Sequence, residues 1–230
     1  MREKGDLCMV WKELISLWHD DDSAMTELLG EFDSMLIKAK DMFSLCTSKL
    51  DQGMPSKSDE SQLKAMDLKL NKLQQQIRRG IVTHISVQGT GNLIPCLQLM
   101  SLTKDAERIG DYCKNILEIL QRSPKLPQDP LIPKALEMRN KILIWFDQTK
   151  KAFDKMDVSL AKATREESYF MEKECDKIVW SLSEDNQGRN AVSMAVLVRF
   201  FKRTAAHLGN ICTSVSQPLD KLDYFQKPPA

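Results

Sequence analysis

The sequence predicts an all-α protein made of two tandem three-helix bundles. Six stretches repeat apolar residues at intervals of three and four, which is the period of an amphipathic α-helix. Glycine is scarce, with 9 residues in a chain of 230, so few positions interrupt these stretches. The segment SPKLPQDPLIP at residues 123–133 holds four prolines and divides the six stretches into two sets of three.

The first set predicts helices over about residues 24–50, 59–79 and 92–122. Ser23 is placed to cap the first helix, and Gly53 with Pro55 separates it from the second. Residues 80–91, which include the β-branched run IVTHISV, are expected to form the connection to the third helix. Asn92 is expected to cap that helix, with Pro95 in its first turn, where proline is tolerated.

The second set predicts helices over about residues 132–155, 159–183 and 190–215, the last stopped by Pro218. The chain therefore divides into an N-terminal amphipathic segment (1–23), a first three-helix repeat (24–122), a Pro-rich linker (123–133) and a second, degenerate repeat (134–230). This pattern is typical of an internal duplication. Whether the two bundles share one core is left open by the periodicity.

The N-terminal segment places its large apolar residues on one helical face and ends in an acidic run, Asp20–Asp22. These apolar residues are Val10, Trp11, Leu14, Ile15 and Trp18. Two interpretations stand: a short helix that packs on the main body, or a helix that docks on a partner or a membrane surface, which the two tryptophans favour. The missing basic face argues against the membrane.

Composition excludes several classes of protein. With 33 Lys and Arg against 32 Asp and Glu, the chain has no global charge signature for nucleic acid or an anionic membrane. The six cysteines are scattered and form no Cys-x-x-Cys pair, so we expect neither a zinc site nor a disulfide framework. No segment resembles a secretory signal or approaches the ~20 apolar residues of a membrane span, so we expect a cytoplasmic protein.

The third predicted helix carries the run DAERIGDYCKNILE at residues 105–118. Ile109 and Cys113 belong to its apolar stripe, while Glu107 and Asp111, four residues apart, stack their carboxylates on another face. Gly110 sits mid-helix, where it costs roughly 1 kcal/mol relative to alanine. We therefore expect a neighbouring helix or a ligand to approach closely at this glycine.

This run resembles the signature of the PhoU family of phosphate-uptake regulators. The residues that stand in the signature positions are Asp105, Glu107, Arg108, Ile109, Gly110, Asp111, Asn115 and Ile116. The preceding helix resembles a second motif of the family through Asp67, Leu70, Asn71, Leu73, Gln74 and Ile77. Asn71 and Gln74 keep oxygen atoms there but lose the charge. The resemblance covers nearly the whole chain after about residue 24 and implies two halves of three helices each.

Four of these residues are candidate metal ligands. If the second and third helices lie side by side, Asp67, Asn71, Glu107 and Asp111 face one shared patch. Carboxylate and amide oxygens suit hard divalent cations such as Mg²⁺, Mn²⁺ or Ca²⁺, and the resemblance implies iron or zinc clusters in some family members. The alternative is a solvated helix face on which the carboxylates pair with nearby lysines and arginines.

The second half keeps a weaker pair of candidate ligands, Glu172 and Asp176. In the preferred alignment of its last helix, Lys202 and Ala206 stand at the places of the first-half glutamate and aspartate. In another register only Asn210 remains at the aspartate position. Both registers lack the carboxylates, and Lys202 would compete with a metal. We therefore predict that any metal binds in the first half.

No catalytic residues are visible, since the chain lacks a P-loop, a GxSxG elbow and an HExxH motif, and a lone histidine such as His207 is typical of a packed, hydrogen-bonded side chain. The resemblance implies a cytoplasmic, non-enzymatic regulator of phosphate uptake. It would act on a phosphate transporter or on a sensor kinase and response regulator, commonly as a homodimer, and reach the membrane only peripherally through a transporter. The alternatives are an accessory subunit of a sodium–phosphate symporter and a metal-dependent enzyme or metal-storage bundle.

Overall fold

The computed structural model describes residues 23–184 and 190–224, and every regular element in these ranges is helical. The elements in chain order are α2 (Ser23–Gln52), α3 (Lys57–Gln88), α4 (Leu93–Arg122), the short 3₁₀ helix η1 (Leu126–Gln128), α5 (Ile132–Lys155), α6 (Val158–Glu184), α7 (Ala191–Ser216) and the 3₁₀ helix η2 (Leu219–Lys221). The predicted all-α class with two sets of three helices is confirmed.

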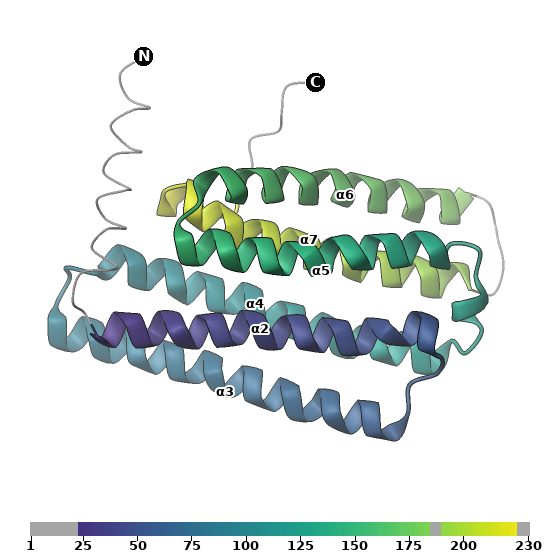
Figure 1. Cartoon of the computed structure of the whole chain (residues 1–230), viewed down its shortest axis with the longest axis horizontal. Coiled ribbons are helices and arrows are strands. Elements are labelled where there is room, and N and C mark those ends of the chain that lie inside the picture. The colour runs from purple at the N-terminus through teal and green to yellow at the C-terminus, as the bar shows by residue number, and fades with distance from the viewer. Residues whose placement is uncertain (1–22, 185–189, 225–230) are drawn as a thin grey trace, which may run out of the picture.

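The two sets of helices lie as two layers, α2, α3 and α4 in one and α5, α6 and α7 in the other (Figure 1). Between the layers α2 packs against α5, and α4 packs against α7. Ion pairs reinforce the first of these contacts at both ends, from Lys150 to Asp33 at 2.7 Å and from Arg139 to Asp51 at 3.0 Å.

One hydrophobic core runs through both layers. The ring of Phe43 on α2 lies 5.9 Å from that of Phe146 on α5 and 5.6 Å from that of Phe201 on α7, centroid to centroid. Phe32 and Phe153 make a similar contact at 5.1 Å. Because these rings are almost fully buried and aromatic pairs at this distance are attractive, the two bundles are fused into a single packed body.

Helix α3 corrects one expectation. The run at residues 80–88 continues the helix to Gln88 instead of forming the connection, because Ile81 and His84 extend its buried stripe. Gly80 fits within it because the side chain of Leu28 occupies the space that a Cβ atom would need. The helix ends at Gly89, whose φ of +76° is one that glycine adopts readily. Tertiary packing here outweighs the weak helix propensity of β-branched residues.

Helices α3 and α4 differ in how their N-termini are capped. Ser56 and Asp59 form a reciprocal capping box at the start of α3, with the Ser56 backbone N–H donating to the Asp59 carboxylate at 2.8 Å. Asn92 precedes α4 but makes no side-chain cap, which corrects the sequence expectation. Its amide nitrogen lies 3.3 Å from His84 Nε2 instead, and this contact holds the α3–α4 turn.

The amphipathic segment with Trp11 and Trp18 lies outside the described residues. Within the described ranges, none of the helices combines the length and the apolar character that a transmembrane span requires.

Candidate functional site on the α3–α4 face

The signature helix α4 lies directly against α3, so the candidate residues of both helices reach one face of the molecule. The close approach expected at Gly110 is present: a Cβ atom there would collide with the side chain of Leu70 on α3 and touch that of Met42 on α2. The glycine therefore lets α3 and α4 pack closely, which brings Asp67 of α3 opposite Asp111 of α4.

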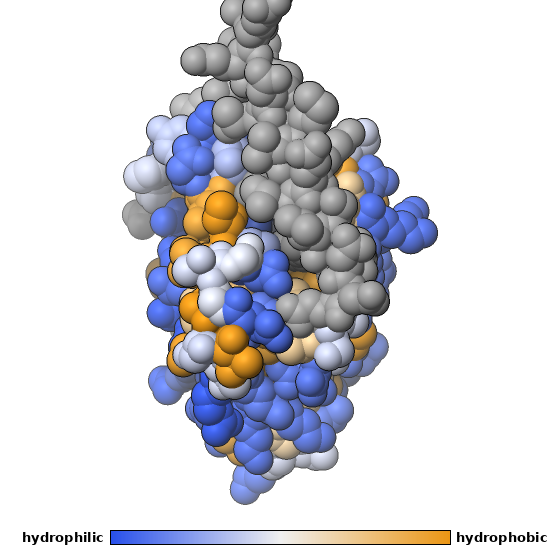
Figure 2. All heavy atoms as spheres, turned by 90° about the vertical axis from the view of Figure 1, so that its left-hand side faces the viewer, coloured by the Kyte–Doolittle hydropathy of each residue, from blue (hydrophilic) through white to orange (hydrophobic). Residues whose placement is uncertain are grey.

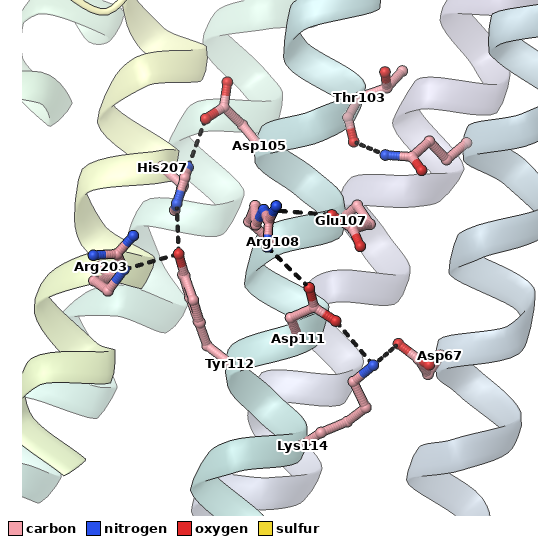
Figure 3. Close-up of polar contacts among 11 residues, drawn as sticks. Asp67, Thr103, Asp105, Glu107, Arg108, Asp111, Tyr112, Lys114, Arg203 and His207 are labelled. Carbon is pink, nitrogen blue, oxygen red and sulfur yellow. Dashed lines mark hydrogen bonds and ion pairs between the residues drawn. The ribbon is translucent and has the colours of Figure 1, made fainter. Parts of the chain in front are cut away.

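Lys114 lies at the centre of this face and joins the two helices. Its ammonium nitrogen is 3.0 Å from Asp67 Oδ1 and 2.9 Å from Asp111 Oδ1, and Figure 3 shows it between the two carboxylates. Partial burial lowers the pKa of Lys114, but hydrogen bonds and charge attraction from Asp111 and Asp67 outweigh the burial and raise that pKa above its ordinary value. The lysine therefore stays charged and bridges α3 and α4.

Glu107 and Asn71 complete the face. Arg108 lies between two carboxylates, with Nε 3.9 Å from Glu107 and a terminal nitrogen 3.6 Å from Asp111. Burial and then the charge of Asp111 raise the pKa of Glu107, while the amide of Asn71 donates to Asp67 at 3.3 Å. The structure thus brings all four sequence-predicted residues to one polar network.

This network, as arranged, fits an ammonium group better than a metal ion. The carboxylate oxygens of Asp67 and Asp111 that a metal would need already face Lys114 at hydrogen-bond distance. Among the described residues, no group of three or more His, Cys, Asp or Glu side chains is arranged to hold a metal ion. Metal binding at these residues stays a prediction, and a metal entering here would have to displace Lys114.

The second-half candidates are also paired with cations. Glu172 accepts a 2.8 Å hydrogen bond from Arg165. Both carboxylate oxygens of Asp176 accept a hydrogen bond from the Lys202 ammonium group, each at 2.6 Å. A terminal nitrogen of Arg199 lies 3.6 Å from Asp176 Oδ1. Lys202, the cation that the alignment places near these carboxylates and that would compete with a metal, is therefore in direct contact with Asp176.

On its opposite side, α4 carries a second polar cluster that the sequence interpretation did not assemble. His207 of α7 lies between two α4 residues, with Nδ1 2.6 Å from Asp105 Oδ1 and Nε2 3.1 Å from the Tyr112 hydroxyl. Arg203 donates to the same hydroxyl at 2.9 Å (Figure 3). Asn210 donates to Asp105 at 3.3 Å. The sequence does contain a signal for this contact. Asp105 belongs to the signature run of the first half, and His207 belongs to the helix of the second half that aligns with that run.

The second cluster is built to join helices. Asp105 and Tyr112 are only 6% and 7% exposed, so their polar atoms depend on partners from α7. The Arg203 guanidinium also lies 5.4 Å from the centroid of the Tyr112 ring, a cation–π distance. These contacts link the two layers at α4 and α7, and the α4 helix thus presents one polar face to α3 and another to α7.

Comparison with known proteins assigns the first layer. The family model described as the PhoU domain matches residues 32–120, which run from within α2 almost to the end of α4. Residues 32–120 are similar to a PhoU domain. The resemblance drawn from the signature run is supported by this match, and the residues of the α3–α4 face lie wholly within the matched range.

Two relatives extend the comparison. The chain is 25% identical over 122 residues to a protein of Synechocystis sp. named as a phosphate-specific transport system accessory protein PhoU homolog. That alignment covers 51% of this chain and 54% of the relative, so it spans about half the length of each. The crystal structure of PhoU from Pseudomonas aeruginosa superposes with a TM-score of 0.74 at 15% identity, over 84% of this chain and 96% of that one. At that identity the match shows the fold, and it reaches beyond residues 32–120 into the second layer.

Proposed function

We propose that this protein is a non-enzymatic regulator of phosphate uptake that acts through protein–protein contacts. The observation that carries the proposal is the similarity of residues 32–120 to the PhoU domain, supported by the name of the Synechocystis relative as an accessory protein of a phosphate transport system. The proposed partners are a phosphate transporter or a sensor kinase with its response regulator, and the proposed working form is a cytoplasmic homodimer that meets the membrane only through its partner.

The α3–α4 face supports a role in contacts rather than in catalysis. Arg108 is 49% exposed and Lys114 37% exposed, so both cations can reach an acidic partner while they keep the α4 carboxylates neutralised. The side-chain oxygens of Asp67 and Asp111 are engaged by the Lys114 ammonium group at 3.0 and 2.9 Å. Charged pairs of this kind suit partner selection and orientation.

The proposal is tested by deleting the gene in its own host and measuring uptake of radiolabelled phosphate in phosphate-rich medium. We expect uptake to stay high without the protein and to be restored to low levels by the wild-type chain. The variant Arg108→Glu with Lys114→Glu should fail to restore control, whereas Lys173→Glu with Lys177→Glu, on the exposed side of α6, should restore it. The comparison requires that circular dichroism first show native helicity for both variants.

Three outcomes would oppose the proposal. Unchanged uptake after deletion would remove the role in phosphate control. A deletion that lowers only sodium-dependent uptake would favour the symporter subunit instead. Restoration by the Arg108→Glu, Lys114→Glu variant would show that the α3–α4 face is not the contact surface.

A further inference from the structure

One side of the molecule, along α4 and α7, carries ion pairs in which the cation is the more exposed partner. Arg199 of α7 is 53% exposed, against 29% for Asp176, the carboxylate that it meets at 3.6 Å. Arg108 and Lys114 of α4 are likewise more exposed than Asp111, which both of them contact. Guanidinium and ammonium groups therefore form the outermost layer here, although the total charge of the chain is close to zero.

The opposite side, along α2 and α5, shows the reverse order. Asp147 of α5 is 66% exposed, and Lys40 of α2, its partner at 2.6 Å, is only 34% exposed. Asp51 similarly extends beyond Arg139. Helices α2 and α5 lie in front of α4 and α7 in Figure 1, so the two arrangements occupy different sides. Figure 2, which looks onto one end of the molecule, shows hydrophilic side chains on both flanks. The sign of the outermost charge is what distinguishes the two sides.

The cations of the α4–α7 side form one continuous row. Arg199 and Arg203 lie four residues apart on α7, so their side chains are neighbours on adjacent turns. Arg203 reaches across to α4, where it donates to the Tyr112 hydroxyl at 2.9 Å, and Arg108 lies one turn before Tyr112. Arg108 and Lys114 contact the same carboxylate of α4, at 3.6 and 2.9 Å (Figure 3). Each member thus adjoins the next, and we call Arg108, Lys114, Arg199 and Arg203 the cationic band.

Two apolar side chains continue the band along α7. Val192 and Val196 precede Arg199 by seven and three residues, which places them on the same face of the helix. They are 76% and 38% exposed. The stripe from Val192 to Arg203 is about 16 Å long at the rise of an α-helix, or about three turns. A surface that is apolar at one end and cationic at the other is complementary to a segment that carries both apolar and acidic residues.

We propose that the cationic band, with Val192 and Val196, is the docking surface for an acidic amphipathic segment of a partner protein. Arginine suits this role because its planar guanidinium binds a carboxylate through two parallel hydrogen bonds. The inference rests on the proposed function for the identity of the partner, since it extends the contact surface from the α3–α4 face onto α7.

Charge favours a protein segment over other anionic occupants. The carboxylates of Asp111 and Asp176 stay partly exposed beside the band, and they would repel the dense phosphates of a membrane surface or a nucleic acid. A protein segment can instead place each of its carboxylates opposite one guanidinium. A second copy of the chain would have to offer its α2–α5 side, and such a head-to-tail contact between unlike surfaces closes only where its rotation forms a ring.

Photo-crosslinking of the full-length protein in its own host tests the inference. The photoreactive residue p-benzoylphenylalanine is introduced at Val192, which is exposed, and the peptide that it captures is identified by mass spectrometry. We expect one segment of a partner protein in which Asp and Glu outnumber Lys and Arg. The same photoreactive residue at Ile144 of α5, which is also exposed but lies on the other side, is the control and should not capture that segment.

The requirement for charge is tested with Arg199→Gln and Arg203→Gln together. We expect the cross-link yield to fall at least about tenfold, because interface arginines carry a large share of binding energy. Arg199→Gln alone leaves the Arg203–Tyr112 contact in place and should lower the yield as well, which separates lost binding from a folding defect. The matched control is Lys141→Gln with Lys151→Gln, two exposed lysines of α5 whose loss removes the same charge and should leave the yield unchanged.

Each contrary result overturns the inference in a recognisable way. The absence of a cross-link at Val192 would mean that nothing docks there. Capture of a lipid, a nucleic acid, a second copy of the chain or a segment without excess Asp and Glu would show a different occupant. A yield that does not depend on the two arginines would show that charge does not hold the segment.

Failure of this inference is distinguishable from failure of the proposed function. Unchanged phosphate uptake after deletion of the gene, together with an arginine-dependent cross-link, would refute the role in uptake and keep the docking surface. Uptake that stays high after deletion, without a cross-link at Val192, would keep the role in uptake and refute the docking surface.

Discussion

Removing Lys114 is the sharpest perturbation of the α3–α4 face. We predict that Lys114→Met destabilises the fold by about 1–3 kcal/mol and converts the face into one that divalent cations stabilise. Two unit charges 3 Å apart attract by about 1.4 kcal/mol in water and about 5.5 kcal/mol at an effective dielectric of 20. Lys114 makes two such contacts, at 3.0 and 2.9 Å, but its side chain is 37% exposed, so solvent screening reduces both toward the lower figure.

The variant also leaves two carboxylates that repel one another across the α3–α4 interface. Asp67 and Asp111 are only 15% and 29% exposed, and like charges at partly buried positions destabilise a fold. A divalent cation that binds only the folded variant would return about 1.4 kcal/mol at ten times its Kd. The wild type should gain much less, because its own ammonium group already holds the position.

Urea unfolding followed by circular dichroism, with and without Mg²⁺ or Mn²⁺, measures both effects. Lys72→Met, an exposed lysine on the same helix as Asp67, is the control for loss of a lysine and should change the unfolding free energy by less than about 0.5 kcal/mol. The reasoning fails if Lys114→Met is as stable as this control, or if divalent cations stabilise the wild type as strongly as the variant.

Three further predictions concern other residues. Metal analysis of the purified protein should find that any bound metal is lost with Glu107→Ala and kept with Glu172→Ala, since the second-half glutamate is engaged by an arginine; the reverse pattern would contradict the assignment to the first half. His207→Ala should cost about 1–3 kcal/mol in urea unfolding because it strips the buried Asp105 of its shortest hydrogen bond, and a neutral result would show that the cluster is not needed to join the layers. Asp59→Ala should cost about 1 kcal/mol near neutral pH. Hydrogen bonds at the capping box lower the pKa of Asp59 to about 2, so this cost should be complete above pH 4 and fade as the pH falls toward 2; a cost that persists at pH 2 would contradict it.

The sequence predicted the elements that depend on periodicity and left out those that depend on how helices are rotated against one another. The stripe through Ile109 and Cys113 is fully buried as expected, and the close approach at Gly110 is present because a mid-helix glycine signals one. The extension of α3 through Gly80 was missed, since propensity alone argues against it and the packing of Leu28 is not visible in the local sequence.

The polar contacts show the same limit. In the sequence Lys114 is one of several cations near the carboxylates, and spacing within α4 does not reveal that its side chain reaches across to Asp67. His207 was expected to be hydrogen-bonded, but its partner Asp105 lies 102 residues earlier in the chain. Such pairs follow from the tertiary arrangement, which a one-dimensional pattern does not contain.

The shared core has a consequence for how the protein can be cut. Phe43 of α2 is enclosed by Phe146 and Phe201 from the other layer, so either half, released alone, would expose an aromatic surface to water. A peptide bond broken in the segment between α4 and α5 would therefore leave two fragments that remain associated and migrate as one particle until a denaturant is added. Expression of residues 24–122 alone would instead yield an aggregation-prone fragment with an incompletely packed core. Co-expression with the remaining residues would restore the native assembly.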